Sequence, residues 1–540
     1  MTDQGTLVTQ APPAEATSRQ HPSGERWSAW VFAGAAIAAL PLLLWFGRDH
    51  WFYLDEWEVL GADGVTPTGY LDAHYGHWNT LLRLEYRLNF ELWGLRSYVP
   101  YMVPAILGHL AIAVLVRQVC WRVGARGWIA TIAGLVFLFF GTGRESMTLG
   151  FQLAWAGSVV CGLVLFLLAD GPRSVIRRDW LALGVGIVGL MTSGVFPPIL
   201  VGFGVTTLLR RGARVTAFYA LPLGVIYTAW YLRYGREETT PLELSTQAVR
   251  FAGRMFAATF DAFAQGGVGA VLVAVAAFGL GTAVHRGWRS GAWAEAAIPV
   301  GLAAGWAAFA AATAVARAMI PQVYSSGRYL YVGAALLLPL VAAGAEQLAR
   351  RRLLLGVAAL LPLAVGLPRN LDRFTQTPIL FRTDRQLTYA IAHSPFIDDA
   401  PADSRPLQVK NAFQPPATAA WLARQAAAGR IPEPDEPLPP QLELTAASRL
   451  VLTQATDTPV GSACPALTAP VTASLERGDE VPFAGAIEVT LTDGTHESAP
   501  RRFLAFDPSV LRAQAGPVDV VVRGIPEGPG WVCPPVPDDR

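Results

Sequence analysis

The feature that most constrains this chain is a series of long apolar runs that carry almost no charge. A helix needs about 17–25 apolar residues to cross the hydrocarbon core of a bilayer. Charged residues make up only 15% of the chain and hydrophobic residues 52%, a balance that indicates lipid as the solvent. The runs predict membrane-spanning helices at 28–46, 98–116, 127–141, 150–169, 215–232, 267–284, 293–315, 329–347 and 353–368.

A further apolar stretch, 180–209, is too long for one crossing. It is interrupted at Thr192-Ser193-Gly194 and at Pro197-Pro198, so we interpret it as two short helices that meet outside the membrane. The run 127–141 is also short. The sequence thus predicts an α-helical polytopic membrane protein with about eleven crossings.

Arginines between the runs set the orientation, because cytoplasmic loops are enriched in positive charge. With a cytoplasmic N-terminus, every predicted inner loop holds at least two arginines, and one span more or fewer would put alternate clusters outside. We therefore predict a multi-pass protein of the cell (plasma) membrane whose C-terminus lies outside. The inner clusters are Arg117, Arg122 and Arg126; Arg173, Arg177 and Arg178; Arg210, Arg211 and Arg214; Arg286 and Arg289; and Arg350, Arg351 and Arg352.

The two ends of the chain are polar. Residues 1–27 are rich in Thr, Gln, Ala, Pro and Ser and are expected to form a disordered cytoplasmic tail. The first apolar run could alternatively be a cleaved signal peptide. It lies behind a polar stretch, lacks a clear cleavage site and is long enough to span, so an uncleaved helix is favoured.

No run after residue 368 is long enough to cross a membrane. We expect a proline-rich external linker at 369–440 and an external, mainly β domain at 441–540. Apolar residues alternate with polar ones from Ile487 to Leu491, and Asp493-Gly494 is typical of a hairpin turn. Further strands are predicted at 450–452, 503–506 and 518–522.

The four cysteines fall into two groups. Cys464 and Cys533 lie in the predicted external domain, where oxidising conditions would let them form a disulfide. Cys120 and Cys161 fall in or beside predicted spans, and we expect both to serve packing.

The distribution of charge excludes some functions. The formal net charge of +1 argues against a nucleic-acid partner. No Asp, Glu or Lys lies near the middle of a predicted span, where proton-coupled transporters usually keep one. The acids are concentrated instead in the predicted first external loop, residues 47–97.

Asp55 and Glu56 follow the first helix and are flanked by aromatic residues. Such a pair could bind a metal, act as a base or simply be solvated. The apolar surroundings favour altered carboxylate properties. A second polar group, Gly143-Arg144-Glu145-Ser146 with Gln152, returns to the same predicted surface.

The segment 76–87 in this loop has the pattern of an amphipathic helix at the membrane interface, with Trp78, Leu81, Leu82, Leu88 and Leu92 on one face. His74 and His77 lie at or just before its start. They could ligate a metal together with the acids, or they could be hydrogen-bonded or exposed.

The order of these motifs, with the topology, resembles the polyprenyl-phosphate-sugar-dependent glycosyltransferases of the GT-C superfamily. The resemblance covers about residues 28–368. It implies an inverting membrane enzyme with an acidic motif in a large first external loop. It rests on Leu54-Asp55-Glu56-Trp57, Gly76-His77-Trp78-Asn79, Ser97-Tyr98-Val99-Pro100-Tyr101, Gly143-Arg144-Glu145, Phe151-Gln152 and Ser326-Gly327-Arg328-Tyr329-Leu330-Tyr331.

The resemblance implies roles for these residues. Asp55 would be the general base, and Glu56 or Glu145 would hold the acceptor or a divalent cation, Mg²⁺ or Mn²⁺. A metal site would draw on Asp55, Glu56 and His74. Arg328 would pair with lipid phosphate or anchor its helix in the interface. The remaining substrate-binding candidates are Arg144, Gln152 and His77.

The predicted function is transfer of a sugar from a polyprenyl-phosphate donor to an acceptor outside the membrane. The acceptor would be a cell-wall glycan, a glycolipid or a protein. Two alternatives are a transporter or flippase of a lipid-linked saccharide, and a non-catalytic membrane protein whose external domain binds glycan.

Overall fold

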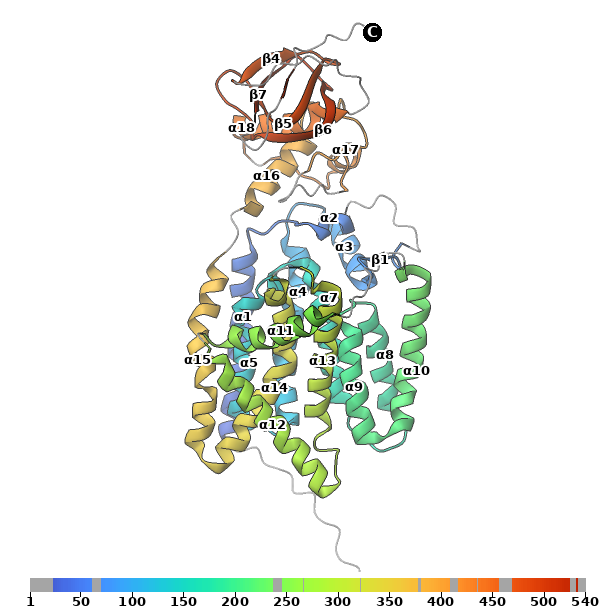
Figure 1. Cartoon of the computed structure of the whole chain (residues 1–540), viewed down its shortest axis with the longest axis vertical. Coiled ribbons are helices and arrows are strands. Elements are labelled where there is room, and N and C mark those ends of the chain that lie inside the picture. Colours follow the sequence, from blue (N-terminus) through green and yellow to red (C-terminus); the bar gives the residue numbers. More distant parts are fainter. Residues whose placement is uncertain are drawn as a thin grey trace, which may run out of the picture.

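A computed structural model gives the architecture of the chain (Figure 1). It describes residues 23–532 except 61–68, 237–244, 266, 321, 377–379, 408–415, 435, 456–468 and 525–530. A bundle of long helices occupies one part of the molecule, and a smaller part built of helices and a β-sheet lies beyond one end of it. Cys464 and Cys533, and with them the predicted disulfide, lie outside the described residues.

A helix forms at each of the apolar segments that the sequence singled out. The helices are α1 (Ser23–Gly47), α4 (Val99–Arg122), α5 (Gly127–Leu138), α7 (Leu153–Leu168), α8 (Arg177–Leu190), α9 (Phe196–Arg211), α10 (Ala213–Trp230), α12 (Gly269–Ser290), α13 (Ala297–Arg317), α14 (Gly327–Arg351) and α15 (Leu353–Thr375). Within the described residues, eight helices are long and apolar enough to cross a bilayer. This is typical of a multi-pass membrane protein. The others, α5, α8 and α9, have only 12, 14 and 16 residues.

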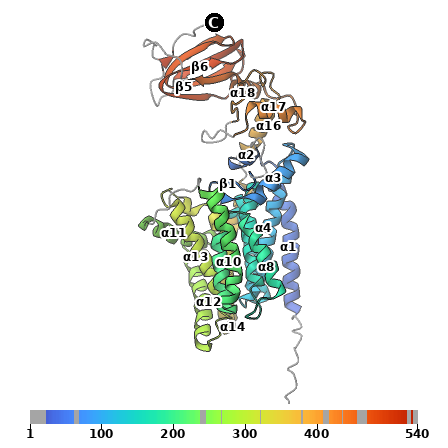
Figure 2. The ribbon, with the colours of Figure 1, turned by 90° about the vertical axis from the view of Figure 1, so that its right-hand side faces the viewer.

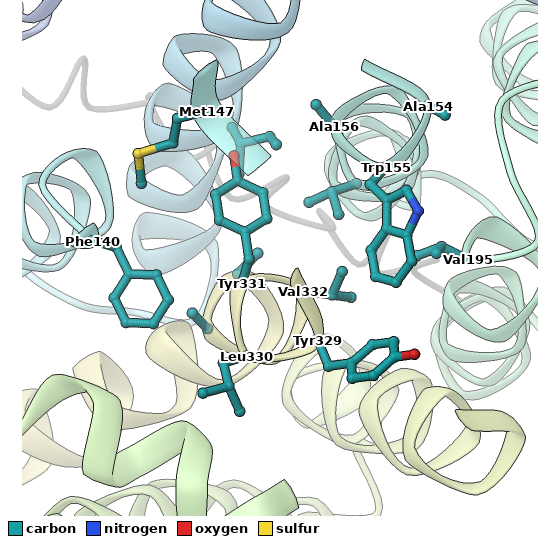
Figure 3. Packing of buried hydrophobic residues seen from close by; sticks show 14 of the residues in the cluster. Phe140, Met147, Ala154, Trp155, Ala156, Val195, Tyr329, Leu330, Tyr331 and Val332 are labelled. Carbon is teal, nitrogen blue, oxygen red and sulfur yellow. The ribbon is translucent and has the colours of Figure 1, made fainter. Parts of the chain in front are cut away.

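Helix α14 is the centre of the bundle. It is buried along most of its length and packs against α4, α12, α13 and α15. Tyr331 and Val332 of this helix lie among side chains from α7 and neighbouring segments, which Figure 3 shows from close by. The two free cysteines of the described residues, Cys120 in α4 and Cys161 in α7, are buried, as expected for packing.

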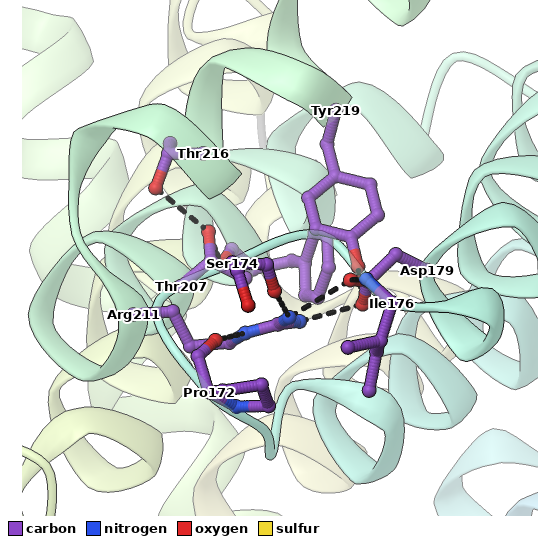
Figure 4. Close-up of polar contacts among 9 residues, drawn as sticks. Pro172, Ser174, Ile176, Asp179, Thr207, Arg211, Thr216 and Tyr219 are labelled. Atoms are coloured by element: carbon purple, nitrogen blue, oxygen red, sulfur yellow. Dashed lines mark hydrogen bonds and ion pairs between the residues drawn. The ribbon is translucent and has the colours of Figure 1, made fainter.

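Buried ion pairs hold the helices together at the end of the bundle that carries the inner arginine clusters. The Arg211 and Asp179 side chains are fully buried, with Nη1 and Nη2 of Arg211 lying 2.6 and 2.8 Å from the two carboxylate oxygens (Figure 4). The Tyr219 hydroxyl donates to the same carboxylate at 2.6 Å. This network joins α8, α9 and α10. At the same end, the buried Glu346 carboxylate of α14 lies 3.0 Å from the exposed side chains of Arg126 and Arg350.

Helix α11 (Thr246–Phe263) was not predicted, and it lies across the bundle in Figure 1. Its large apolar residues Phe251, Met255 and Phe260 are buried on one face, whereas Val249 is exposed. A search for continuous apolar runs misses such a helix because half of its surface is polar. Helix α10 continues into a π-helical turn, Tyr231–Gly235.

The segment between α1 and α4 forms short elements at the opposite end of the bundle from the buried ion pairs (Figure 1). These are α2 (Asp55–Leu60), a hairpin of β1 (Ala73–His74) and β2 (His77–Trp78), and α3 (Thr80–Trp93). The predicted helix at 76–87 therefore begins only at Thr80, because Tyr75 and Gly76 adopt positive φ angles and turn the chain back on itself.

The prediction of which residues share the apolar face of α3 is wrong. Leu82, Tyr86 and Phe90 pack into the protein, whereas Leu88 and Leu92 are 60% and 64% exposed. The helix thus has two apolar stripes, and the outer one faces away from the protein. An exposed stripe of leucines is what an interfacial helix presents to lipid.

After α4, a set of short elements fills the same end: η1 (Gly141–Gly143), α6 (Glu145–Thr148) and η2 (Gly150–Gln152), with η5 (Val323–Ser325) between α13 and α14. Thr192 to Gly194 form the turn between α8 and α9, and the Leu81 N–H donates to the Met191 carbonyl oxygen at 3.2 Å. The interruption in the 180–209 stretch therefore lies against the first loop.

Residues 380–451 include three helices, α16 (Leu380–Ala392), α17 (Ala419–Ala427) and α18 (Pro440–Val451). A six-stranded antiparallel sheet follows, in the order β3-β6-β5-β7-β4, with β8 pairing with β5. Figure 2 shows it beyond α16–α18, at the end of the molecule that holds α2 and α3. The strands are β3 (Leu452–Ala455), β4 (Val471–Leu475), β5 (Glu480–Thr492), β6 (Arg501–Ala513), β7 (Val518–Gly524) and β8 (Trp531–Val532).

The predicted β pattern is confirmed with one adjustment. The inward residues Ile487, Val489 and Leu491 are buried, and Gly494 has a φ of 87° in the β5–β6 connection. The segment predicted at 450–452 is mostly helical, because α18 continues to Val451 and β3 starts at Leu452.

Candidate functional site

Asp55 is the first residue of α2 and is partly buried. Burial raises the pKa of its carboxyl group, while the positive charges of Arg328 and Arg317 pull that pKa back down. The two guanidinium groups are therefore close enough to act on the carboxylate. Partial burial and neighbouring positive charge thus both act on the pKa of Asp55, and these two influences also set the pKa of catalytic carboxylates.

Arg328 lies at the start of α14, with its guanidinium 5.7 Å from the centre of the Trp155 ring and 5.4 Å from that of Tyr329. Figure 3 shows these two rings, one from α7 and one from α14. Nε of Arg328 is buried and has no hydrogen-bond partner among the described residues. Aromatic rings thus position a cation whose donors remain available for an anionic ligand.

Arg317 ends α13, one short connection before Arg328. The sequence analysis missed it, although an arginine directly after an apolar run at its predicted outer end was a usable signal. Both arginines act on His77 as well as on Asp55. The two arginines thus lie within electrostatic range of both groups, and the four residues are called here the Asp55 cluster: Asp55, His77, Arg317 and Arg328.

His77 belongs to strand β2, opposite the turn between α8 and α9. Burial lowers its pKa to about 4, and the charges of Arg317 and Arg328 act in the same direction. The imidazole is therefore neutral at neutral pH. A Cβ atom at Gly194 would lie 2.2 Å from Nδ1 of His77, so this turn needs glycine for the ring to fit.

Glu56, the neighbour of Asp55, faces the protein interior and is buried. Its carboxylate accepts hydrogen bonds from the Tyr98 hydroxyl at 2.6 Å, the Tyr53 N–H at 2.8 Å, the Phe151 N–H at 3.3 Å and the Tyr86 hydroxyl. Burial raises its pKa to about 7, and these hydrogen bonds oppose the rise. With both oxygens occupied, Glu56 fixes α2 in place, a role that differs from the predicted contact with acceptor or cation.

The predicted metal ligands do not converge. Nδ1 of His74 lies 3.4 Å from the Glu58 carboxylate, and Glu56 is occupied as described. Among the described residues, no three His, Cys, Asp or Glu side chains are grouped so that they could hold a metal ion. Asp55, Glu56 and His74 thus do not fit a common Mg²⁺ or Mn²⁺ ion.

The residues of the second predicted polar group, 143–146 with Gln152, do not share one role. Nη1 of Arg144 donates to the carbonyl oxygens of Arg373, at 2.7 Å, and Gln376, so it caps the end of α15. Glu145 is exposed and, after burial, is the largest contributor to the raised pKa of Tyr53, followed by Asp55. Glu145 therefore lies near the Asp55 cluster. Gln152 is buried, and its Oε1 has no partner among the described residues.

The chain after α15 contacts the first loop directly. Nε1 of Trp51 donates to the Thr388 hydroxyl at 3.4 Å, and the Tyr389 hydroxyl donates to the Leu95 carbonyl oxygen at 2.7 Å. Asp384, one turn before Thr388 in α16, adds its negative charge to those around Tyr53. No sequence signal connected 380–392 with the first loop, because the contact joins segments more than 280 residues apart.

Comparison with known proteins finds no matching family model, no matching curated protein and no matching solved structure.

Proposed function

We propose that the chain is an inverting glycosyltransferase that moves a sugar from a polyprenyl-phosphate donor to an extracytoplasmic acceptor. The observation that carries the proposal is the Asp55 cluster, in which two guanidinium groups lie within electrostatic range of a partly buried carboxylate and of a neutral imidazole. A base and a phosphate-binding pair of cations are the two elements that this transfer needs. The GT-C resemblance of the first loop supports the same function.

Asp55 takes the proton of the acceptor hydroxyl as the oxygen attacks the anomeric carbon. Its raised pKa makes it a stronger base than an exposed aspartate, while the guanidinium charges keep it ionised. The bond from the anomeric carbon to the phosphate oxygen breaks on the opposite face, so the configuration inverts. Glu145, exposed beside the cluster, positions the acceptor.

Arg328 and Arg317 stabilise the negative charge that grows on the departing lipid phosphate. Guanidinium groups suit phosphate oxygens because they donate two parallel hydrogen bonds in a fixed plane. The unpartnered Nε of Arg328 supports this role. His77 is neutral at neutral pH and serves as a hydrogen-bonding group beside the two arginines.

The sidedness of the site follows from the arginine-rich loops. Under the positive-inside rule, the end with Arg211, Arg126 and Arg350 is cytoplasmic. The Asp55 cluster and the β-rich region then lie outside the plasma membrane. In this arrangement the short helices α5, α8 and α9 also cross, which gives about eleven crossings with the N-terminus inside.

The test is to incubate the purified full-length protein with a panel of polyprenyl-phosphate sugars and a mixture of glycan, glycolipid and peptide acceptors. The proposal predicts release of polyprenyl phosphate and a product whose anomeric configuration is opposite to that of the donor. Export of an unchanged lipid-linked sugar in proteoliposomes, with no bond cleavage for any donor, would instead support a transporter.

A further inference from the structure

A cavity lies away from the Asp55 cluster, in the part of the chain that follows the bundle. Its volume is about 850 Å³, and it is bounded by the end of α16, the segment 393–396, the proline-rich residues 433–434 and 436–440, the start of α18 and the tip of the β5–β6 connection. Cavities of about 300–1,000 Å³ are typical of small-molecule sites. Nothing in the proposed transfer reaction uses this one.

The lining combines apolar surfaces with carboxylates. Phe396, Leu438, Leu444 and several prolines form the apolar part, and the acids are Glu433, Glu436, Glu443 and Asp493. No arginine or lysine lines the described cavity. An anionic ligand is therefore disfavoured, and a ligand with many hydrogen-bond donors is favoured.

Some polar side chains that line the cavity have hydrogen-bonding atoms that the described residues do not use. Glu436 and Glu443 are exposed, and within the described part of the chain neither side-chain carboxylate forms a hydrogen bond or an ion pair. Ser394, which also lines the cavity, is only 8% exposed. Its hydroxyl oxygen accepts from the Phe396 N–H at 3.3 Å, and its proton has no acceptor among the described residues. A buried donor left unused beside a cavity is a position at which a ligand oxygen gains a hydrogen bond.

A sugar has chemistry that matches both parts of this lining. The C–H face of a pyranose or furanose ring packs on phenylalanine and proline, while its hydroxyl edges donate to carboxylates and accept from a hydroxyl such as that of Ser394. A cationic peptide is the other class of ligand that would satisfy the carboxylates, and the experiment below separates the two.

The cavity and the first loop are connected through α16. Thr388 and Tyr389 of α16 contact the first loop, while Ala390 of the same helix and His393, which directly follows it, line the cavity. Nε2 of His393 lies 3.1 Å from the Ile431 carbonyl oxygen, just before the proline-rich residues. A ligand held here would lie on the outer side of the catalytic loop.

We propose that this cavity is a binding site for a neutral oligosaccharide. The assignment of this oligosaccharide as the acceptor of the transfer reaction rests on the proposed function. The binding of an oligosaccharide in this cavity does not depend on that function.

The experiment measures binding by calorimetry with the full-length protein in lipid nanodiscs. The probes are neutral tetrasaccharides of glucose, mannose and arabinose, an anionic tetragalacturonate and a tetra-arginine peptide. The double variant Glu436→Gln/Glu443→Gln is compared with Glu488→Gln, which removes a surface carboxylate on β5 that pairs with Arg502 outside the cavity. Each lost hydrogen bond to a carboxylate is expected to weaken binding by about tenfold.

We expect at least one neutral tetrasaccharide to bind, and the double variant to weaken it by about tenfold or more while Glu488→Gln leaves it unchanged. That result supports the site whether or not the preparation transfers sugar. Failure of all three neutral probes, equal affinity for the double variant, or a preference for tetra-arginine overturns it. A protein that transfers sugar but binds no tetrasaccharide here keeps the proposed function and loses this inference.

Discussion

The Tyr98 hydroxyl lies 2.6 Å from a carboxylate oxygen of Glu56, although the two residues are 42 positions apart. The same hydroxyl accepts a hydrogen bond from the Gly150 N–H at 2.7 Å. Through this pair, α2, the start of α4 and the η2 segment are joined at one point. The position of Asp55, next to Glu56, therefore depends on a buried polar network, and the two neighbouring acids have different tasks.

Replacement of Glu56 by Gln should reduce stability. The amide oxygen can replace one carboxylate oxygen, but the NH₂ group would face donors and could not accept from them. Loss of hydrogen bonds to a buried charged group costs about 2–3 kcal/mol. Thermal unfolding in detergent should therefore shift to a lower temperature, whereas Asp72→Asn, on an exposed residue of the same loop, should leave it unchanged. An unaltered melting temperature would contradict the structural role of Glu56.

Glu85 of α3 should make the protein less stable at alkaline pH. Burial raises its pKa to about 8 from an ordinary value of 4.5, and its hydrogen bond with Asn89 opposes the rise. The folded state therefore binds the proton more tightly than the unfolded chain. The stability from this group is fully present below pH 4.5 and is lost as the pH rises through about 8. Melting temperatures between pH 5 and pH 9 should fall less steeply for Glu85→Gln than for the wild type; parallel curves would refute this.

Asp179→Asn should be among the most destabilising single changes in the bundle. It would leave the fully buried Arg211 guanidinium without its counter-charge, and breaking a buried pair costs about 3–5 kcal/mol. Asp170→Asn is the matched control, because Asp170 pairs with Arg122 and Arg210 at the same end but is partly exposed. Thermal unfolding of both variants checks the prediction, and an equal loss in the two would show that burial is not the cause.

The termini should lie on opposite sides of the membrane. A reporter that is active only in the cytoplasm should give a signal when fused at residue 10 and none when fused after residue 540. Signal at both positions would require an even number of crossings and would place the β-rich region on the cytoplasmic side, which the arginine-rich loops do not allow.

The sequence was most informative where one local pattern decides the structure. A long uncharged run has few alternatives to a membrane helix, so a helix formed at each predicted segment. The alternation from Ile487 to Leu491 likewise predicted a buried strand face. The inner stripe of α3, with Tyr86 and Phe90, and the whole of α11 were not predicted, because each helix carries its apolar residues on only part of its surface.

The site was predictable only in its parts. Asp55 and His77 were singled out from residue type and position, and Arg328 from the family resemblance. In the structure, Asp55 and His77 both lie within electrostatic range of Arg328 and of the unexpected Arg317. The roles of Glu56 and Arg144 are set by hydrogen bonds to partners that are distant in the sequence. Glu56 accepts from Tyr98, and Arg144 donates to the end of α15. Long-range contacts of this kind, including Trp51 with Thr388, leave no periodic signal in a single sequence.

The central claim is that Asp55 is the general base, and the most direct measurement is the transfer rate of Asp55→Asn with a donor that the wild type uses. The amide keeps the shape of the side chain but cannot take the proton, so the rate should fall by about 10²–10⁴. The melting temperature should stay nearly unchanged, in contrast to Glu56→Gln, and Glu145→Gln should have a milder effect on transfer. If Asp55→Asn protein is fully active with that donor, Asp55 is not the base and the catalytic assignment of this loop fails.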